Sequence, residues 1–251
     1  MKVVNKLDNI TMSSNLAIFD IDNTLIRGST IFELGLEFRK NDLVSLRDLC
    51  SMFYNNVRYR LSSYENNTTE IKERTLSIIK GVPLSDIDNM IDRVIDRVIN
   101  KQIYRKSLNL IEKHKDSNDI IYLATAGPKY IATRLSDCLG LSGAIGTEIE
   151  IKDGICTGNL IGTVKQGVEK AKAIRELIAK NSFENKILYC YSDSIKDLPM
   201  LNESEFPAAV NPDKKLRKIA MNNNWSIYNT KNLLDNKILV VCSNIKSFIK
   251  S

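Results

Sequence analysis

The amino-acid sequence predicts an α/β fold, in which helices cover both faces of a parallel β-sheet. Short apolar runs recur along the 251-residue chain, and stretches with helical spacing lie between them. Runs that are apolar at every position are typical of strands buried on both faces, as in a parallel sheet. Four such runs are present: LAIF (16–19), IIYLA (120–124), ILYCY (187–191) and ILVVC (238–242).

The composition is that of an ordinary globular protein with one or two domains. The chain is 43% hydrophobic and 26% charged, which excludes a disordered, collagen-like or low-complexity protein. Because no run of about 18 apolar residues is present, we expect no membrane-spanning helix. The N-terminal segment lacks the apolar core of a secretory signal, and we therefore expect a cytoplasmic protein.

The distribution of charged residues and cysteines limits the kinds of partner and of site that we expect. The net charge of +6 comes from Lys and Arg residues spread along the chain. This spread is weak evidence for nucleic acid and fits small anionic ligands equally well, and we expect neither nucleic acid nor a membrane as a partner. The cysteines are scattered and odd in number, which indicates neither a disulfide framework nor a zinc site, and we expect them to be small buried residues. They are Cys50, Cys138, Cys156, Cys190 and Cys242.

The first apolar run is followed at once by two carboxylates, Asp20 and Asp22, in the segment DIDNTL. Carboxylates two residues apart at a strand end point to the same side while the chain stays extended, and ligands of open α/β sheets bind at this edge. One carboxylate can attack a substrate and the other can carry protons. The alternative is a plain strand-to-loop turn, which Asp and Asn favour.

Between the first two apolar runs, residues 28–115 have helical spacing and no convincing strand, which indicates a helical insertion. Its clearest element follows Pro83, where apolar residues form a stripe on one helix face. Ser85 and Asp88 resemble a capping box at the start of this helix. The stripe could line a ligand groove, but core packing is the usual role of such spacing. Its members are Ile87, Met90, Ile91, Val94, Ile95, Val98 and Ile99.

The second apolar run leads into Thr125, Ala126 and Gly127, a hydroxyl and two small residues before a segment with helical spacing. The first N–H groups of a helix have no partner within the helix, and together with the helix dipole they bind phosphate. These three residues are therefore candidates for phosphate binding. Any strand-to-helix turn could give the same pattern.

Two further candidates follow later in the chain. Lys170 lies near the start of an amphipathic stretch, where a lysine opposes the helix dipole. This placement indicates a bound anion, although a solvated surface lysine is the commoner explanation. Asp193 and Asp197, after the third run, are one helical turn apart and would supply the hard oxygen ligands that Mg²⁺ prefers. Helix capping and an ion pair are their alternative roles.

Taken in this order, the segments resemble the motifs of the haloacid dehalogenase superfamily of phosphohydrolases. The segments are FDIDNTL (19–25), LATAG (123–127), GVEK (167–170) and YSDSIKDLP (191–199), and AVNPD (209–213) also resembles the subgroup containing phosphoserine phosphatase. The likeness extends from about Leu16 to Ile227. It implies a Rossmann-like parallel-sheet core formed by residues 1–27 and 116–251. It also implies a helical cap, residues 28–115, inserted between the first and second motifs.

The resemblance implies a Mg²⁺-dependent phosphatase that hydrolyses a small phosphomonoester through an aspartyl-phosphate intermediate. Asp20 would be the nucleophile and Asp22 the general acid and base. Mg²⁺ would be held by the Asp20 carboxylate, the Asp22 backbone carbonyl and Asp193. The remaining site residues would be Thr125, Ala126, Gly127 and Lys170, which bind the phosphoryl oxygens, and Asp197 and Thr24, which support them.

The substrate within this class stays open at the level of sequence. The phosphoserine phosphatase pattern has a glutamate nine residues after the nucleophile, where this chain has Ser29, and Glu33 and Arg74 could make substitute contacts. A cap of the expected size favours a small phosphorylated metabolite over a phosphoprotein or a polymer. The alternatives are phosphoserine phosphatase proper and a phosphotransferase or phospho-acceptor signalling domain that uses the same aspartate. The oligomeric state is unknown.

Overall fold

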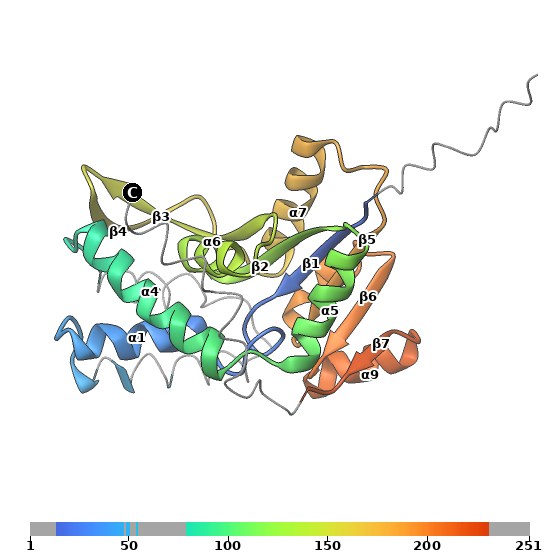
Figure 1. Cartoon of the computed structure of the whole chain (residues 1–251), viewed down its shortest axis with the longest axis horizontal. Coiled ribbons are helices and arrows are strands. Elements are labelled where there is room, and N and C mark those ends of the chain that lie inside the picture. Colours follow the sequence, from blue (N-terminus) through green and yellow to red (C-terminus); the bar gives the residue numbers. More distant parts are fainter. Residues whose placement is uncertain (1–13, 48, 51–53, 55–78, 231–251) are drawn as a thin grey trace, which may run out of the picture.

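The computed structural model describes residues 14–47, 49–50, 54 and 79–230. In these residues one seven-stranded sheet has the order β4-β3-β2-β1-β5-β6-β7 (Figure 1). All neighbouring strands are parallel except β3 and β4, which form an antiparallel pair. The strands are β1 (Leu16–Asp20), β2 (Ile120–Pro128), β3 (Gly143–Lys152), β4 (Ile155–Ile161), β5 (Leu188–Ser192), β6 (Phe206–Val210) and β7 (Ser226–Tyr228).

The predicted α/β class and the first three apolar runs are confirmed, since those runs coincide with β1, β2 and β5. The fourth run, 238–242, lies outside the described residues. β1 is apolar at every position before Asp20 because it contributes to two separate cores. Ala17 and Phe19 pack into the core on one face of the sheet, whereas Leu16 and Ile18 pack into the core on the other.

Helices cover both faces of the sheet (Figure 1). Buried residues of α1, α4, α5 and α6 join the core that contains Phe19, and buried residues of α7, α8 and α9 join the core that contains Ile18. None of the described helices is long and apolar enough to cross a membrane. The helices are α1 (Thr30–Lys40), α4 (Leu84–Lys101), α5 (Arg105–Asp116), α6 (Lys129–Cys138), α7 (Val168–Asn181), η1 (Ile195–Asp197), α8 (Leu198–Leu201) and α9 (Lys214–Asn222).

The described part of the insertion contains α1, α4 and α5 and no strand, as its spacing predicts. Every member of the predicted apolar stripe on α4 is buried and joins the core, and two of them, Ile87 and Ile91, also line a cavity beside it. The predicted capping box is wrong. α4 begins at Leu84 directly after Pro83, so Ser85 already lies inside the helix, and Asp88 instead accepts a hydrogen bond from the hydroxyl of Tyr130.

The described cysteines are free thiols, and they differ in burial. Cys156 and Cys190 are buried, as expected for small apolar residues. Cys50 is exposed and Cys138 is half-buried, so the expectation is wrong for these two. Cys50 is exposed because its neighbour Leu49 occupies the buried side of the chain. Cys242 lies outside the described residues.

The strand register places the predicted site residues at one edge of the sheet. Asp20 at the end of β1 pairs with Ala124 of β2, one residue before Thr125. On the other side of β1, Phe19 pairs with Tyr191 of β5, two residues before Asp193. The carboxyl ends of three adjacent parallel strands therefore meet at Asp20, which is where open α/β sheets bind ligands.

Candidate active site

Asp20 is the last residue of β1 and is only 6% exposed. Both of its carboxylate oxygens are engaged. Lys170 Nζ donates to Oδ1 at 2.8 Å, and the hydroxyl of Thr24 donates to Oδ2 at 3.1 Å. Burial raises the pKa of Asp20 to about 7, because the lowering effect of the Lys170 ammonium is opposed by repulsion from Asp197 and Asp22.

The loop after Asp20 is held in a fixed shape. The Leu25 N–H donates to the Ile21 carbonyl at 2.9 Å, and both side chains are buried. Asn23 adopts a left-handed backbone conformation with φ of 61°, which Asn tolerates better than most residues. Its carbonyl accepts a hydrogen bond of 3.0 Å from the carboxamide of Asn211, which itself lies in the left-handed region with φ of 48°. Asn211 thereby ties the loop after Asp20 to the end of β6.

The Asp22 carboxylate faces the start of α1. Its Oδ1 accepts hydrogen bonds from the Thr30 N–H at 2.9 Å and the Thr30 hydroxyl at 3.1 Å, and its Oδ2 accepts one from the Ser29 hydroxyl at 3.0 Å. Ser29, the N-cap residue, makes no side-chain cap of its own. Asp22 therefore caps α1 from outside the helix.

Thr125, Ala126 and Gly127 lie at the carboxyl end of β2, in an irregular stretch where the register with β3 shifts. The strand continues to Pro128, so these residues extend β2 rather than form the expected turn, and α6 begins directly afterwards. The Gly127 N–H donates to the Thr125 hydroxyl at 2.9 Å. A Cβ at Gly127 would lie 3.2 Å from this hydroxyl and 3.6 Å from that of Thr30. The segment thus lies against the helix turn that binds Asp22.

Lys170 lies in the first turn of α7 and is 2% exposed. Its ammonium contacts two carboxylates, Asp20 at 2.8 Å and Asp197 at 2.8 Å. Burial lowers the pKa of a lysine, but the attraction of Asp197 and Asp20 outweighs it and raises the pKa of Lys170 above its usual value. Lys170 is therefore a buried, permanently charged cation in the site, and the solvated-lysine alternative is excluded.

Asp193 and Asp197 have different positions and partners. The expectation that an α-helical turn aligns them is wrong, because Asp193 precedes η1, a short 3-10 helix that Asp197 ends. The Asp197 carboxylate accepts hydrogen bonds from Lys170 and, at 2.7 Å, from the Ser192 hydroxyl. Asp197 thus forms an ion pair with Lys170 and positions it, which agrees with the ion-pair alternative considered from the sequence.

Two positioning residues, Asn211 and Asp213, lie in the AVNPD segment, to which the sequence analysis gave no role in the site. The Asp213 N–H donates to the Asp193 carbonyl at 2.8 Å, and its carboxylate accepts from the Ile195 N–H at 2.8 Å. The same carboxylate caps α9 by accepting from the N–H groups of Lys215 and Leu216. An Asp directly before a helical segment is a recognisable N-cap signal, but its second role on the Asp193 loop is visible only in three dimensions.

The donor chemistry of this edge fits a hard divalent cation. The predicted ligands are the carboxylates of Asp20 and Asp193 and the backbone carbonyl of Asp22, all of them oxygen donors. Near Lys170, two carboxylates face one ammonium, and the pKa of Asp20 is raised mainly by burial, to which repulsion from Asp197 and Asp22 adds. Across the described residues, no group of three or more His, Cys, Asp or Glu side chains is arranged to hold a metal ion, so the set depends on the backbone carbonyl.

Comparisons with known proteins agree with these motifs. The family model described as haloacid dehalogenase-like hydrolase matches residues 17–202. Phosphoserine phosphatase SerB1 of Mycobacterium tuberculosis (strain ATCC 25618 / H37Rv) is 32% identical over 213 residues, which are 84% of this chain and 69% of that protein. A histidinol-phosphatase of Neisseria meningitidis serogroup C (strain 8013) is 29% identical over 224 residues, covering 86% and 99% of the two chains.

Among solved structures, a protein of unknown function from Bordetella pertussis Tohama I has the same fold. The TM-score is 0.76 at 21% identity, over 86% of this chain and 99% of that one. The resemblance inferred from the four segments is confirmed, and the match covers most of the sheet and the residues at its carboxyl edge. This chain belongs to the haloacid dehalogenase-like hydrolase family.

Proposed function

We propose that this protein is a Mg²⁺-dependent phosphatase that hydrolyses small phosphomonoesters through an aspartyl-phosphate on Asp20. The observation that carries the proposal is the buried arrangement in which Lys170 bridges Asp20 and Asp197 at the end of β1. A buried carboxylate with both oxygens held by donors is oriented before the substrate arrives, and orientation of a nucleophile lowers the barrier to attack.

In the first step, an Asp20 oxygen attacks phosphorus as the bond between phosphorus and the ester oxygen breaks. Asp22, in its protonated form, gives its proton to the departing alkoxide. In the second step, a water attacks the phosphorus of the aspartyl-phosphate, Asp22 accepts a proton from that water, and inorganic phosphate leaves. Asp22 is therefore proposed to act in both steps, as acid and then as base.

Cationic and hydrogen-bonding groups of the site are proposed to balance the negative charge on the transferred phosphoryl group. The Lys170 ammonium and the Thr125 hydroxyl are proposed to bind the phosphoryl oxygens, together with N–H groups of Ala126 and Gly127. Mg²⁺, held by Asp20, Asp193 and the Asp22 carbonyl, would offset the repulsion between these carboxylates and the phosphate. The helical insertion, residues 28–115, is proposed to be a cap that restricts the site to small phosphorylated metabolites.

Hydrolysis of p-nitrophenyl phosphate tests this proposal. We expect turnover with Mg²⁺, none after chelation by EDTA, and none for Asp20→Asn protein whose circular dichroism matches that of the parent. Stable labelling of the protein by a phosphodonor without release of phosphate would instead favour a phospho-acceptor signalling domain. Absence of both turnover and labelling would refute the proposal.

Phosphoserine phosphatase proper is the second candidate, favoured by the name of the relative from M. tuberculosis. Glu33 and Arg74 were the two residues considered as contacts for the amino acid part of phosphoserine. Glu33 accepts hydrogen bonds from Arg97 at 2.6 Å and from Gln102 at 2.7 Å, so it already has partners within the insertion. Arg74 lies outside the described residues. Parallel assays with O-phospho-L-serine, L-histidinol phosphate and p-nitrophenyl phosphate, of which only the last has no aliphatic amino group, decide whether an amino-bearing phosphate is preferred.

A further inference from the structure

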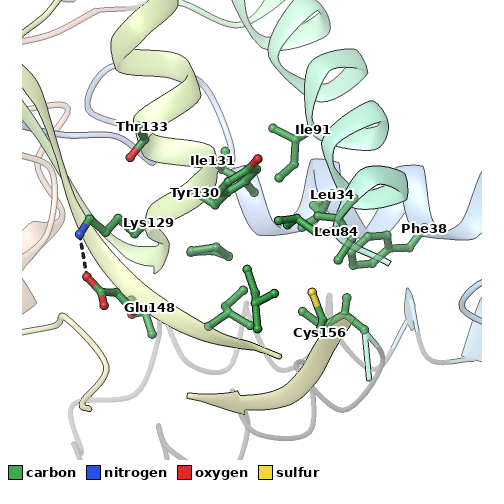
Figure 2. Close-up of a pocket in the computed structure, with 16 residues that line it drawn as sticks. Leu34, Phe38, Leu84, Ile91, Lys129, Tyr130, Ile131, Thr133, Glu148 and Cys156 are labelled. Carbon is green, nitrogen blue, oxygen red and sulfur yellow. Dashed lines mark hydrogen bonds and ion pairs between the residues drawn. The ribbon is translucent and has the colours of Figure 1, made fainter. Parts of the chain in front are cut away.

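The structure contains an apolar cavity beside the proposed phosphate site. Its volume is about 320 Å³, and it lies between α1, α4 and α6 on one side and the β3–β4 hairpin on the other (Figure 2). This volume is at the lower end of the range for small-molecule sites. The lining is mainly aliphatic and aromatic, and it includes Leu34, Phe38, Leu84, Ile87, Ile91 and Ile149.

We propose that this cavity binds an apolar portion of the substrate, so that the preferred substrate is a phosphomonoester of a short alkyl or single-ring alcohol. This inference rests on the phosphatase function proposed above and specifies its substrate class. It differs from recognition of an amino acid phosphate, which needs charged partners for an ammonium and a carboxylate.

Three residues that line the cavity also border the proposed phosphate site. Pro128 lines the cavity and directly follows Gly127. Thr147 also lines it, and its hydroxyl donates to the Ala126 carbonyl at 2.8 Å. Leu34 lies one helical turn after Thr30, the residue that binds Asp22. A group attached to a phosphate at Thr125–Gly127 would therefore have the cavity as a neighbouring apolar surface.

The charged residues near the cavity are already paired. Of the described residues that line it, Lys129 and Glu148 carry charge, and they form an ion pair with each other at 2.6 Å (Figure 2). Each of these side chains is close to half exposed, so the pair lies at the edge rather than inside. A ligand in the cavity therefore meets mainly apolar side chains, and burial of an apolar group against them favours binding.

The two acidic residues of α1, Glu33 and Glu37, also have hydrogen-bonding partners within the protein. Glu33 is bound by Arg97 and Gln102, and Glu37 is bound by Arg93 at 2.5 Å and by Arg97 at 3.2 Å. Burial raises the pKa of Glu37, but the hydrogen bonds from Arg93 and Arg97 outweigh this effect and hold it below its usual value. These carboxylates join α1 to α4, and a substrate ammonium would have to displace an arginine to reach them.

A chain-length series tests the inference on the unmodified protein. We expect kcat/KM to rise about threefold to fourfold for each methylene added between ethyl phosphate and hexyl phosphate, about a hundredfold in total. O-phospho-L-serine should be hydrolysed less efficiently than hexyl phosphate. A flat series, or a preference for O-phospho-L-serine, would overturn the inference.

Leu84→Trp places an indole at the half-buried start of α4 and reduces the space in the cavity. We expect it to lower kcat/KM for hexyl phosphate about tenfold while changing that for ethyl phosphate less than twofold. Met221→Trp is the matched control, because Met221 is 65% exposed on α9 and does not line the cavity. An equal loss with both substrates in Leu84→Trp would contradict the inference.

The two proposals fail in distinguishable ways. If p-nitrophenyl phosphate is hydrolysed but the alkyl series is flat, the phosphatase function stands and the apolar subsite is refuted. If no phosphomonoester is hydrolysed, the proposed function is refuted and the subsite with it.

Discussion

The Lys170 ammonium lies 2.8 Å from the Asp20 carboxylate, although 150 residues separate them in the chain. The same ammonium contacts Asp197, and all three side chains are buried. A buried cation between two buried carboxylates is stable only while each partner is present, because an unpaired charge in the interior is costly. The contact therefore links the proposed chemistry of the site to the stability of the fold.

Replacement of Lys170 by Met should reduce both activity and stability. Asp20 and Asp197 would then repel each other without a cation, and we expect the free energy of unfolding to fall by about 3 kcal/mol. Turnover should fall at least hundredfold, because a charge that stabilises the transition state is lost. Thermal unfolding and steady-state kinetics measure these effects. Lys172→Met, on the exposed side of the same helix, should change neither quantity by much.

Replacement of Asp22 by Asn should slow hydrolysis by an amount that depends on the leaving group. An alkoxide needs a proton to depart, whereas p-nitrophenolate does not, so formation of the aspartyl-phosphate from an alkyl phosphate should slow about a thousandfold and its formation from p-nitrophenyl phosphate far less. Comparison of kcat/KM for the two substrates checks this, because kcat/KM reports the formation of the aspartyl-phosphate and not its later hydrolysis, in which Asp22 is also proposed to act. Equal losses with both would argue against Asp22 as the acid, and would point to its contacts with α1 instead.

Binding of Mg²⁺ should depend on pH through Asp20. In the absence of metal, burial raises the pKa of this carboxyl to about 7, so below that pH a bound proton competes with the cation. The apparent dissociation constant should rise about tenfold for each pH unit below the pKa and be nearly constant above it. Calorimetric titration across this range measures the dependence and the proton released. A dissociation constant independent of pH would contradict the assignment of Asp20 as a ligand.

Replacement of Asn211 by Ala should loosen the loop that follows Asp20. The carboxamide of Asn211 donates to the Asn23 carbonyl, and its oxygen accepts from the Thr230 N–H at 2.6 Å. Loss of these bonds should lower the free energy of unfolding by about 2 kcal/mol and kcat about tenfold, with little change in KM. Asn223→Ala, an exposed position at the end of α9, serves as the control in the same kinetic and unfolding measurements.

The sequence predicted β1, β2 and β5 because these strands are buried on both faces, which forces an uninterrupted apolar pattern on each of them. It did not predict β3, β4, β6 and β7, which contain exposed positions. It also named residues that lie at the carboxyl edge of the sheet, since Asp20 and Thr125 directly follow two of the apolar runs. Pairing between distant polar residues was not predictable in the same way. Lys170 was a candidate for anion binding in the sequence, but its ion pair with Asp20 depends on how α7 packs on the sheet, which the local pattern does not contain.

Two features of residues 28–115 could not be predicted from the sequence and became visible only in the structure. Glu33 was available in the sequence as a contact for a substrate amine, but packing of α1 on α4 commits it to Arg97 and Gln102. Ser85 resembled a helix cap, but a helix can begin directly after proline because the proline ring already fixes φ near the helical value. Local patterns do not contain the side-chain partners that tertiary packing supplies.

Chemical trapping of the phosphorylated residue tests the central claim most directly. The protein is quenched during turnover of p-nitrophenyl phosphate with Mg²⁺, reduced with borohydride, which converts an aspartyl-phosphate to homoserine, and analysed by mass spectrometry of its peptides. The account predicts homoserine at position 20 and none in Asp20→Asn protein. Homoserine at another aspartate, or turnover without any modification of Asp20 under these conditions, would contradict it.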